Sequence, residues 1–264
     1  MNILEFYART RTPYLHARGR RGTGVLLESL GQVEAGNILE LGFGTGQTLV
    51  DVAVRKPDCV LFGIEKSETM LRVARKRLKF SGLGGIRLSL WSSGELLPYP
   101  DHFFEAAYAE SVLACLPEQE IGHIMSEVFR VLKNGGVFLL NESLWRRHVS
   151  PATIKKINEE CIGLFGIPQA CEEIPYPEDW AALAGRAGFE LEKMTSLAKV
   201  SGVSALPVVP AALRSRLFTL AGKLGTRFVG PLRLLAGQFR AAERSFDRYG
   251  PFLEGFFFVF RKPG

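Results

Sequence analysis

Long apolar runs and paired cysteines are both missing from this chain of 264 residues. No run of about 18 uncharged apolar residues occurs, so we expect no membrane-spanning helix. The first residues, 1–11, lack the apolar stretch of a secretory signal. The four cysteines, at positions 59, 115, 161 and 171, form no CxxC pair, which argues against a zinc or redox centre. We therefore expect free thiols, no metal site and a cytoplasmic location.

Acidic residues are scarce in one late part of the chain. The formal net charge is +6, and residues 211–248 contain eight lysines and arginines but only two acids, Glu243 and Asp247. This segment therefore holds the whole excess of positive charge. Such a segment is most often a solvated helical face, although it can also meet nucleic acid, anionic lipid or an acidic substrate.

What the chain does have is a regular alternation of strand and helix patterns. Apolar runs predict strands at 37–41, 59–65, 86–91, 104–110, 136–142, 189–197 and 255–261. Helical patterns occupy 47–55, 68–80, 118–132, 151–165 and 177–187. Near-continuous apolar strands that alternate with helices are typical of βαβ units and of a parallel sheet covered on both faces. We predict an α/β fold with a doubly wound, seven-stranded, mostly parallel Rossmann-like sheet.

The chain divides into four expected parts: an N-terminal cap segment (1–35), the sheet core (36–199), a helical insertion (200–250) and a final core strand (251–264). The insertion is too long for a structureless loop. Apolar residues follow a helical period first at Leu213, Leu217, Leu220, Ala221 and Leu224, and then at Leu232, Leu235, Phe239, Ala242 and Phe246. We predict two amphipathic helices that form a lid, together with residues 1–21, over a binding site.

Three glycines at alternating positions, Gly42, Gly44 and Gly46, follow the first predicted strand. Glycine is needed where the backbone turns with positive φ or where a ligand touches the main chain. At the carboxyl end of a parallel strand, such a loop lies where nucleotide-like ligands bind. A dinucleotide loop places its third glycine one residue later, where this chain has Gln47. The spacing therefore favours a nucleoside without phosphates.

Two acids near this loop support the same interpretation. Glu65 ends the second predicted strand, where a carboxylate can accept hydrogen bonds from both ribose hydroxyls. The alternative for Glu65 is an exposed acid at a strand end. Glu40 precedes the loop, where it would repel a pyrophosphate but attract a cationic ligand.

Four segments resemble, in order, the motifs of the class I S-adenosylmethionine-dependent methyltransferases, particularly the branch that acts on small molecules. LELGFGTG is similar to the first motif and GIEKSETML to the second. SSGELLPYPDHFFEAAYAE and EVFRVLKNGGVFLLNE resemble the two later ones. The resemblance spans residues 36–142 and continues more weakly to 199. It implies S-adenosylmethionine as cofactor and methyl transfer to a small organic acceptor.

The resemblance also assigns roles within the cofactor site. The methionine part would lie against Glu40, Gly42, Phe43, Gly44 and Gly46, and Glu110 would also contact the cofactor. Glu65 would hold the ribose, while Lys66 and Met70 would flank the adenine. The family usually has Asp where this chain has Ser93, at the position that bonds the adenine amino group. A serine hydroxyl can still accept that bond, and the backbone of Gly94 and Glu95 could assist.

The acceptor site would lie over the carboxyl ends of the fourth and fifth strands. Glu110 or Glu142 could act there as a base, or instead contact the cofactor or cap a helix. His16, in the N-terminal segment, is a third candidate base or substrate contact. Residues 109–112 lack the Pro-Pro tetrad typical of base amino-group methylation, and Cys115 does not directly adjoin a proline. Both observations disfavour methylation of nucleic-acid bases.

We expect a small acceptor that is apolar or partly anionic, closed beneath the lid. Peripheral docking on an anionic membrane is the alternative role for the basic helices. Two other functions compete with the enzyme: a non-catalytic cofactor-binding or regulatory protein of the same fold, and an RNA methyltransferase, which the pI of about 9.2 would suit. A nucleic-acid partner is disfavoured because the basic residues spread around the helices. The sequence favours no particular oligomeric state.

Overall fold

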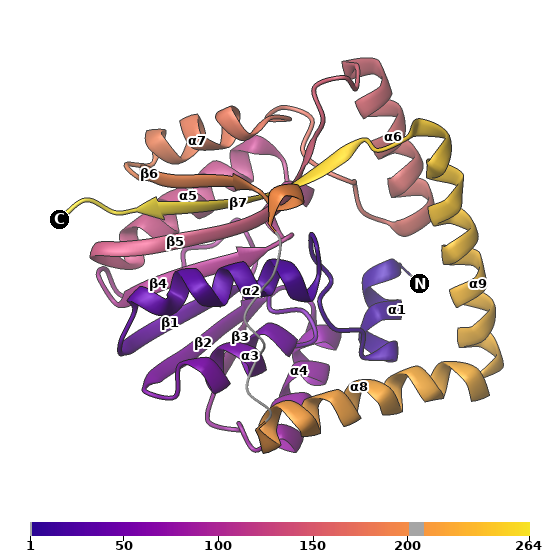
Figure 1. Cartoon of the computed structure of the whole chain (residues 1–264), viewed down its shortest axis with the longest axis horizontal. Helices are drawn as coiled ribbons and strands as arrows, with labels where there is room; N and C mark the ends of the chain where they lie inside the picture. The colour runs from indigo at the N-terminus through magenta and orange to yellow at the C-terminus, as the bar shows by residue number, and fades with distance from the viewer. Residues whose placement is uncertain (1, 201–208) are drawn as a thin grey trace.

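A seven-stranded sheet forms the centre of the computed structural model, which describes residues 2–200 and 209–264 (Figure 1). The strands are β1 (Gly36–Leu41), β2 (Cys59–Glu65), β3 (Arg87–Leu90), β4 (Phe104–Glu110), β5 (Leu132–Trp145), β6 (Glu190–Ser196) and β7 (Leu253–Arg261). Their order across the sheet is β3-β2-β1-β4-β5-β7-β6. Among the described strands, β7 runs antiparallel to both of its neighbours. The predicted seven-stranded, mostly parallel Rossmann-like sheet is confirmed.

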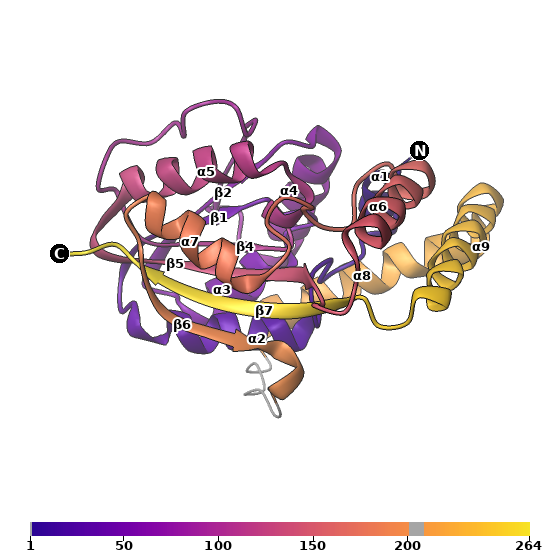
Figure 2. The ribbon, with the colours of Figure 1, turned by 90° about the horizontal axis from the view of Figure 1, so that it is seen from above.

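Helices cover both faces of this sheet (Figure 2). One face is covered by α2 (Arg20–Ser29), α3 (Gln47–Arg55) and α4 (Glu68–Ser81), and the other by α5 (Glu118–Val131) and α7 (Pro177–Arg186). Side chains alternate between the faces, so Ile38 packs toward α3 whereas Leu39 and Leu41 pack toward α5. Burial on both faces explains why the strands are almost continuously apolar.

Four further helices lie beyond the carboxyl ends of the parallel strands: α1 (Ile3–Thr10), α6 (Pro151–Phe165), α8 (Pro210–Phe228) and α9 (Gly230–Ser245) (Figure 1). The short 3₁₀ turns are η1 (Leu30–Gln32), η2 (Leu113–Cys115), η3 (Leu197–Lys199) and η4 (Phe246–Tyr249). The sequence did not predict α1, which Asn2 caps by accepting a hydrogen bond from the Glu5 N–H. No helix within the described residues is long and apolar enough to cross a bilayer.

Strand β5 begins earlier than predicted. Helix α5 ends at Val131, and β5 starts at Leu132, ahead of the strand that we predicted from residue 136. Leu132 pairs with Phe104, but the next pair is Val137 with Ala106, so residues 133–136 bulge from the ladder. Gly135 has a φ of 75° there. The glycines therefore mark a bulge within the strand.

The two predicted helices of the insertion are present as α8 and α9, while residues 201–208 of that insertion lie outside the described residues. The stripe on α9 turns inward as expected, with Phe239 buried against Phe6 and Phe165. The leucine stripe on α8 turns outward, and the buried face of α8 carries Phe218 with smaller residues instead. These leucines therefore do not close over a binding site, contrary to our expectation.

Candidate functional site

A cavity of about 650 Å³ lies at the carboxyl ends of β1, β2, β4 and β5. In a doubly wound sheet, this edge is where ligands bind. The glycine loop and the ends of β2 and β4 form one part of the wall, and α1, η2 and the end of α6 form the other. Of the predicted site residues, the cavity brings together His16, Gly42, Gly44, Glu65, Lys66, Met70, Ser93, Glu110 and Glu142.

The glycine loop leaves bare backbone on the cavity wall. Gly42, Gly44 and Gly46 have φ values of 67°, 50° and 77°, which side chains other than glycine rarely adopt. A Cβ atom at Gly42 would lie only 2.5 Å from a methyl carbon of Val112. Gly46 faces Ala74, away from the cavity, where it caps α3. Gly42 and Gly44 thus line the cavity, and Gly46 serves the turn into the helix.

Glu65 lies at the end of β2 with both carboxylate oxygens anchored to the backbone. One oxygen accepts from the Gly44 N–H at 3.0 Å and the other from the Ser67 N–H at 2.9 Å. Burial raises the pKa of this carboxyl above its usual range, while those backbone hydrogen bonds oppose the rise. Each oxygen keeps a second lone pair for a ligand hydroxyl. The side chain is therefore fixed in a position that suits the two hydroxyls of a ribose.

Ser93 lies on the cavity wall and donates its hydroxyl hydrogen to the carboxylate of Glu120, in the first turn of α5. The serine oxygen therefore keeps lone pairs that can accept a hydrogen bond from an amino group. Sequence reasoning missed Glu120, because it is 27 positions away and carries no local motif. The structure does not bring Gly94 or Glu95 to the wall, and the Glu95 carbonyl faces His123 instead.

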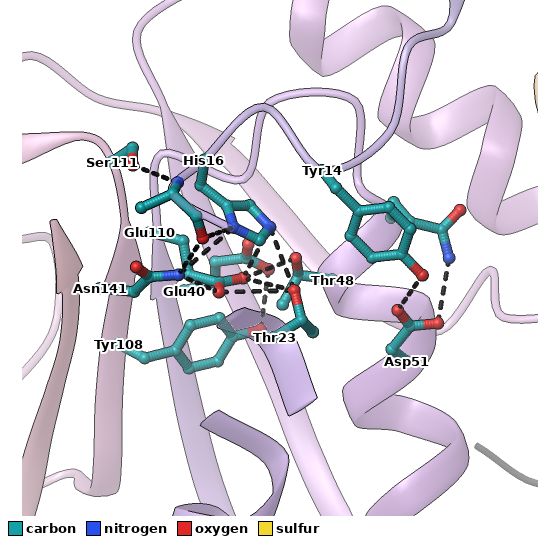
Figure 3. A network of polar contacts seen from close by, with 12 residues as sticks. Tyr14, His16, Thr23, Glu40, Thr48, Asp51, Tyr108, Glu110, Ser111 and Asn141 are labelled. Atoms are coloured by element: carbon teal, nitrogen blue, oxygen red, sulfur yellow. Dashed lines mark hydrogen bonds and ion pairs between the residues drawn. The ribbon is translucent and has the colours of Figure 1, made fainter. Parts of the chain in front are cut away.

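Glu110 ends β4 and anchors the N-terminal segment through its carboxylate (Figure 3). This carboxylate accepts hydrogen bonds from Thr48 at 2.9 Å, from the Asn141 amide at 3.0 Å and from Thr23 at 3.2 Å. The Nε2 atom of His16 lies 3.3 Å away, and both side chains are almost fully buried. A polar residue within an apolar strand, such as Asn141, is the feature of the sequence that could have indicated a partner of Glu110. Four elements therefore meet at one carboxylate.

Glu40 and Phe43 lie beneath the site and not on its wall. Glu40 is buried in β1 and accepts a hydrogen bond of 2.8 Å from the Tyr108 hydroxyl. Burial holds the pKa of this carboxyl well above its usual range. Burial thus disfavours the charged form of Glu40, which weakens the attraction of a cationic cofactor that we expected from it. The Phe43 ring packs over Gly63, where a Cβ atom would lie 2.6 Å from it.

Glu142 points to the opposite face of the sheet from its neighbour Asn141. It is fully buried and accepts backbone N–H bonds from Val112, Leu113 and Ala114, at 3.1, 3.0 and 3.3 Å. Burial raises the pKa of this carboxyl to about 7. Glu142 therefore shapes the η2 turn, which forms part of the cavity wall.

Comparison with known proteins assigns a family to this geometry. A model of a methyltransferase domain matches residues 38–136, which include the glycine loop, Glu65 and Ser93. The uncharacterized methyltransferase YdaC of Bacillus subtilis is 29% identical over 139 residues, which cover 53% of this chain and 74% of that protein. Residues 38–136 therefore form a domain of the class I S-adenosylmethionine-dependent methyltransferase family. The predicted cofactor and enzyme class are thereby confirmed, as is methyl transfer to a small molecule.

Two other similarities have a narrower scope. The demethylmenaquinone methyltransferase of Symbiobacterium thermophilum is 34% identical over 111 residues, so the match spans 40% of this methyltransferase and 42% of the relative. The crystal structure of the [4+2]-cyclase SpnF superposes with a TM-score of 0.65, at 21% identity, and covers 96% of this chain and 87% of that one. The structural likeness shows the shared fold alone, because one fold supports different chemistries.

Proposed function

We propose that this methyltransferase acts on a small, apolar and uncharged acceptor that binds between α1 and α6. The observation that carries the proposal is the composition of the cavity wall beyond the cofactor residues. This part of the wall consists of Ile3, Leu4 and Tyr7 from α1, Phe165 at the end of α6, and Ile167 just after α6. Apolar walls of this kind suit an apolar ligand.

The charges on the wall favour the apolar acceptor over the partly anionic one. The wall carries four carboxyl groups, from Glu65, Glu110, Glu142 and Glu243. Its ammonium group comes from Lys66. A negatively charged acceptor would meet more repulsion than attraction in such a cavity. The acceptor named for the relative from Symbiobacterium thermophilum, demethylmenaquinone, is consistent with an apolar class.

The cofactor supplies a methyl group on a sulfonium, and the protein aligns the acceptor for in-line displacement. The bare backbone at Gly42 and Gly44 and the fixed carboxylate of Glu65 fit its nucleoside and methionine parts. We assign Glu110 and His16 as positioning residues, because their polar atoms already bond to each other and to Thr23 and Asn141. They hold the N-terminal segment over the reacting atoms, and that enclosure excludes water.

Label transfer from methyl-labelled S-adenosylmethionine tests the proposal with three acceptor classes: a neutral hydroxylated aromatic with an apolar tail, a carboxylated aromatic, and RNA. We expect label in the neutral acceptor. Leu4→Glu, which places a carboxylate on the wall, should raise KM for that acceptor by about tenfold or more, because burying an unpaired charge is costly. Leu96→Glu, at an exposed apolar position, is the matched control. Label confined to the anionic acceptor or to RNA would refute the proposed acceptor class.

Two further expectations from the sequence remain proposals. The four cysteines are free thiols, which is consistent with a reducing cytoplasm. A membrane surface is the second partner that we propose. The support for it comes from the outward face of α8.

A further inference from the structure

The outward face of α8 carries an uncovered stripe of leucines. Leu213, Leu217, Leu220 and Leu224 are 43–51% exposed, and their spacing of three and four residues aligns them on one side of the helix. Phe228, at the end of the helix, is 84% exposed. Single exposed apolar residues are ordinary, but a contiguous apolar stripe marks an interaction surface.

The opposite side of α8 is fixed to the protein, so the leucines cannot turn inward. Ser215 and Thr219 bond to the buried guanidinium of Arg77 on α4. The Phe218 ring lies against Phe80, and a Cβ atom at Gly222 would lie 2.4 Å from the Thr10 carbonyl oxygen. The helix is therefore anchored along its length with its leucines facing outward.

The charge on α8 itself has one sign. Its sequence, from Pro210 to Phe228, contains four lysines and arginines and no acid. Arg214 and Arg216 are exposed beside the leucines, and α4, against which α8 packs, adds exposed Lys76 and Lys79. A helix with an apolar stripe and basic flanks is typical of a protein that lies in the interface of an anionic bilayer.

We propose that the outward face of α8 docks on an anionic lipid bilayer. The leucines would enter the boundary between headgroups and acyl chains, and the arginines would contact lipid phosphates. Nucleic acid would match the positive charge but would leave the leucines uncovered. A second copy of the chain would cover the leucines but would bring two basic flanks together. A bilayer with anionic headgroups satisfies both features.

This docking face is joined to the cavity by a single helix. Thr10, which α8 contacts at Gly222, ends α1, and α1 supplies Ile3, Leu4 and Tyr7 to the cavity wall. Figure 1 shows α8 along the bottom of the molecule and α1 directly above it. An apolar acceptor that partitions into the bilayer would thus be delivered beside its site. This consequence rests on the proposed function, whereas the docking does not.

Co-sedimentation of the full chain with lipid vesicles tests the docking. We expect binding to phosphatidylcholine vesicles that contain phosphatidylglycerol, and about tenfold weaker binding to phosphatidylcholine alone or at high salt. Leu217→Glu/Leu220→Glu and, separately, Arg214→Glu/Arg216→Glu should each weaken binding by about tenfold or more. The matched controls lie on α6, at the other end of the molecule (Figure 1): Ile162→Glu/Leu164→Glu for exposed apolar residues and Lys155→Glu/Lys156→Glu for exposed cations.

Equal vesicle binding by the α8 and α6 variants would overturn the proposal, as would absence of binding by the unaltered chain. Sedimentation velocity without lipid provides a separate outcome. A dimer that the α8 leucine variant dissociates, with no binding to vesicles, would assign the stripe to self-association and refute bilayer docking. A methyl-transfer assay with a water-soluble, short-tailed acceptor separates a failure of docking from a failure of the proposed function. If the α8 variant still methylates this acceptor, it is folded and only its docking has changed.

Discussion

Ser93, where we predict the adenine to bind, donates its hydroxyl hydrogen to the Glu120 carboxylate. We expect Ser93→Ala to weaken S-adenosylmethionine binding about fivefold, which corresponds to the loss of one hydrogen bond. Ser93→Asp should fail to strengthen binding, because two carboxylates would then face each other. Ser93→Asp combined with Glu120→Gln relieves that repulsion and should bind more tightly than Ser93→Asp alone. Isothermal titration calorimetry measures each dissociation constant.

Ser126→Ala is the control for this series, because Ser126 lies exposed on the same helix as Glu120 and bonds only within that helix. Its affinity for the cofactor should equal that of the unaltered protein. An unchanged affinity in Ser93→Ala would show that the serine does not contact the adenine.

Glu142 makes folding stability depend on pH near neutrality. Its pKa is about 7 in the folded protein, above the ordinary value of 4.5, because burial disfavours the charged form. The folded state therefore binds a proton more tightly than the unfolded state does. This contribution to stability is complete below about pH 4.5 and is lost as the pH rises through 7. Its size is about 3 kcal/mol.

Urea unfolding at a series of pH values between 4.5 and 8 measures this effect, with Glu142→Gln as the comparison. Glutamine keeps a carbonyl oxygen for the N–H groups of the η2 turn but does not titrate. The variant should therefore gain stability relative to the unaltered protein as the pH rises. A difference that stays constant over this range would contradict the assigned pKa.

Some of the predicted site residues that line the cavity are held in a local motif. Gly42, Gly44 and Glu65 belong to a loop and a strand end whose spacing alone predicts their place at the cavity. The partners of Glu110 could not be predicted in the same way, because Thr23 and Asn141 approach it from distant parts of the chain. Burial of Glu40 is likewise a tertiary effect, set by the helix that covers that face of the sheet.

Among the elements, α4 and α8 are held together by a buried arginine, whose hydrogen bonds within the described residues go to carbonyl, amide and hydroxyl oxygens. Arg77 donates hydrogen bonds to the carbonyl oxygens of Thr45 and Arg11 and to the hydroxyls of Ser215 and Thr219. Burial lowers the pKa of this guanidinium to about 10, so it stays charged at neutral pH. One side chain therefore links the glycine loop, the N-terminal segment and α8.

Arg77→Met should lower the free energy of unfolding by about 3 kcal/mol, because several buried acceptors lose their donor. Urea unfolding measures the loss. Arg75→Met is the control, since Arg75 is exposed on the same helix and bonds one carbonyl oxygen. Its stability should differ from that of the unaltered protein by less than about 0.5 kcal/mol. Equal losses in the two variants would show that the buried contacts carry no net stability.

The orientation of α8 follows from this arginine, and the sequence could not predict it. A leucine stripe normally marks the buried face of a helix, which is why we expected Leu213 and Leu217 to face the site. Arg77 requires polar partners, so the face with Ser215 and Thr219 turns inward instead. The inward turn of α9 was predictable, because Phe239 lies on its one strongly apolar face.

Across the whole molecule, the cavity is enclosed by segments that are far apart in the chain. Helix α1 comes from the beginning of the sequence, α6 from its middle and Glu243 from α9 near its end. The sheet between them was predictable from strand periodicity, because each βαβ unit is local. The enclosure was not, because it depends on how three segments meet. A ligand in this cavity contacts all of them and should stabilise the molecule as a whole.

S-adenosylmethionine at about 100 times its dissociation constant should raise the free energy of unfolding by about 2.7 kcal/mol, because it binds the folded state alone. For a chain of this size, Tm should rise by about 5 °C in differential scanning calorimetry. Glu65→Gln keeps the shape of the side chain but removes the charge that strengthens its bonds to the ribose, so at the same ligand concentration its Tm should rise less. Glu192→Gln, at an exposed position on β6, is the control and should show the full rise. Equal shifts in Glu65→Gln and the control would place the ribose away from Glu65, even though the family assignment would stand.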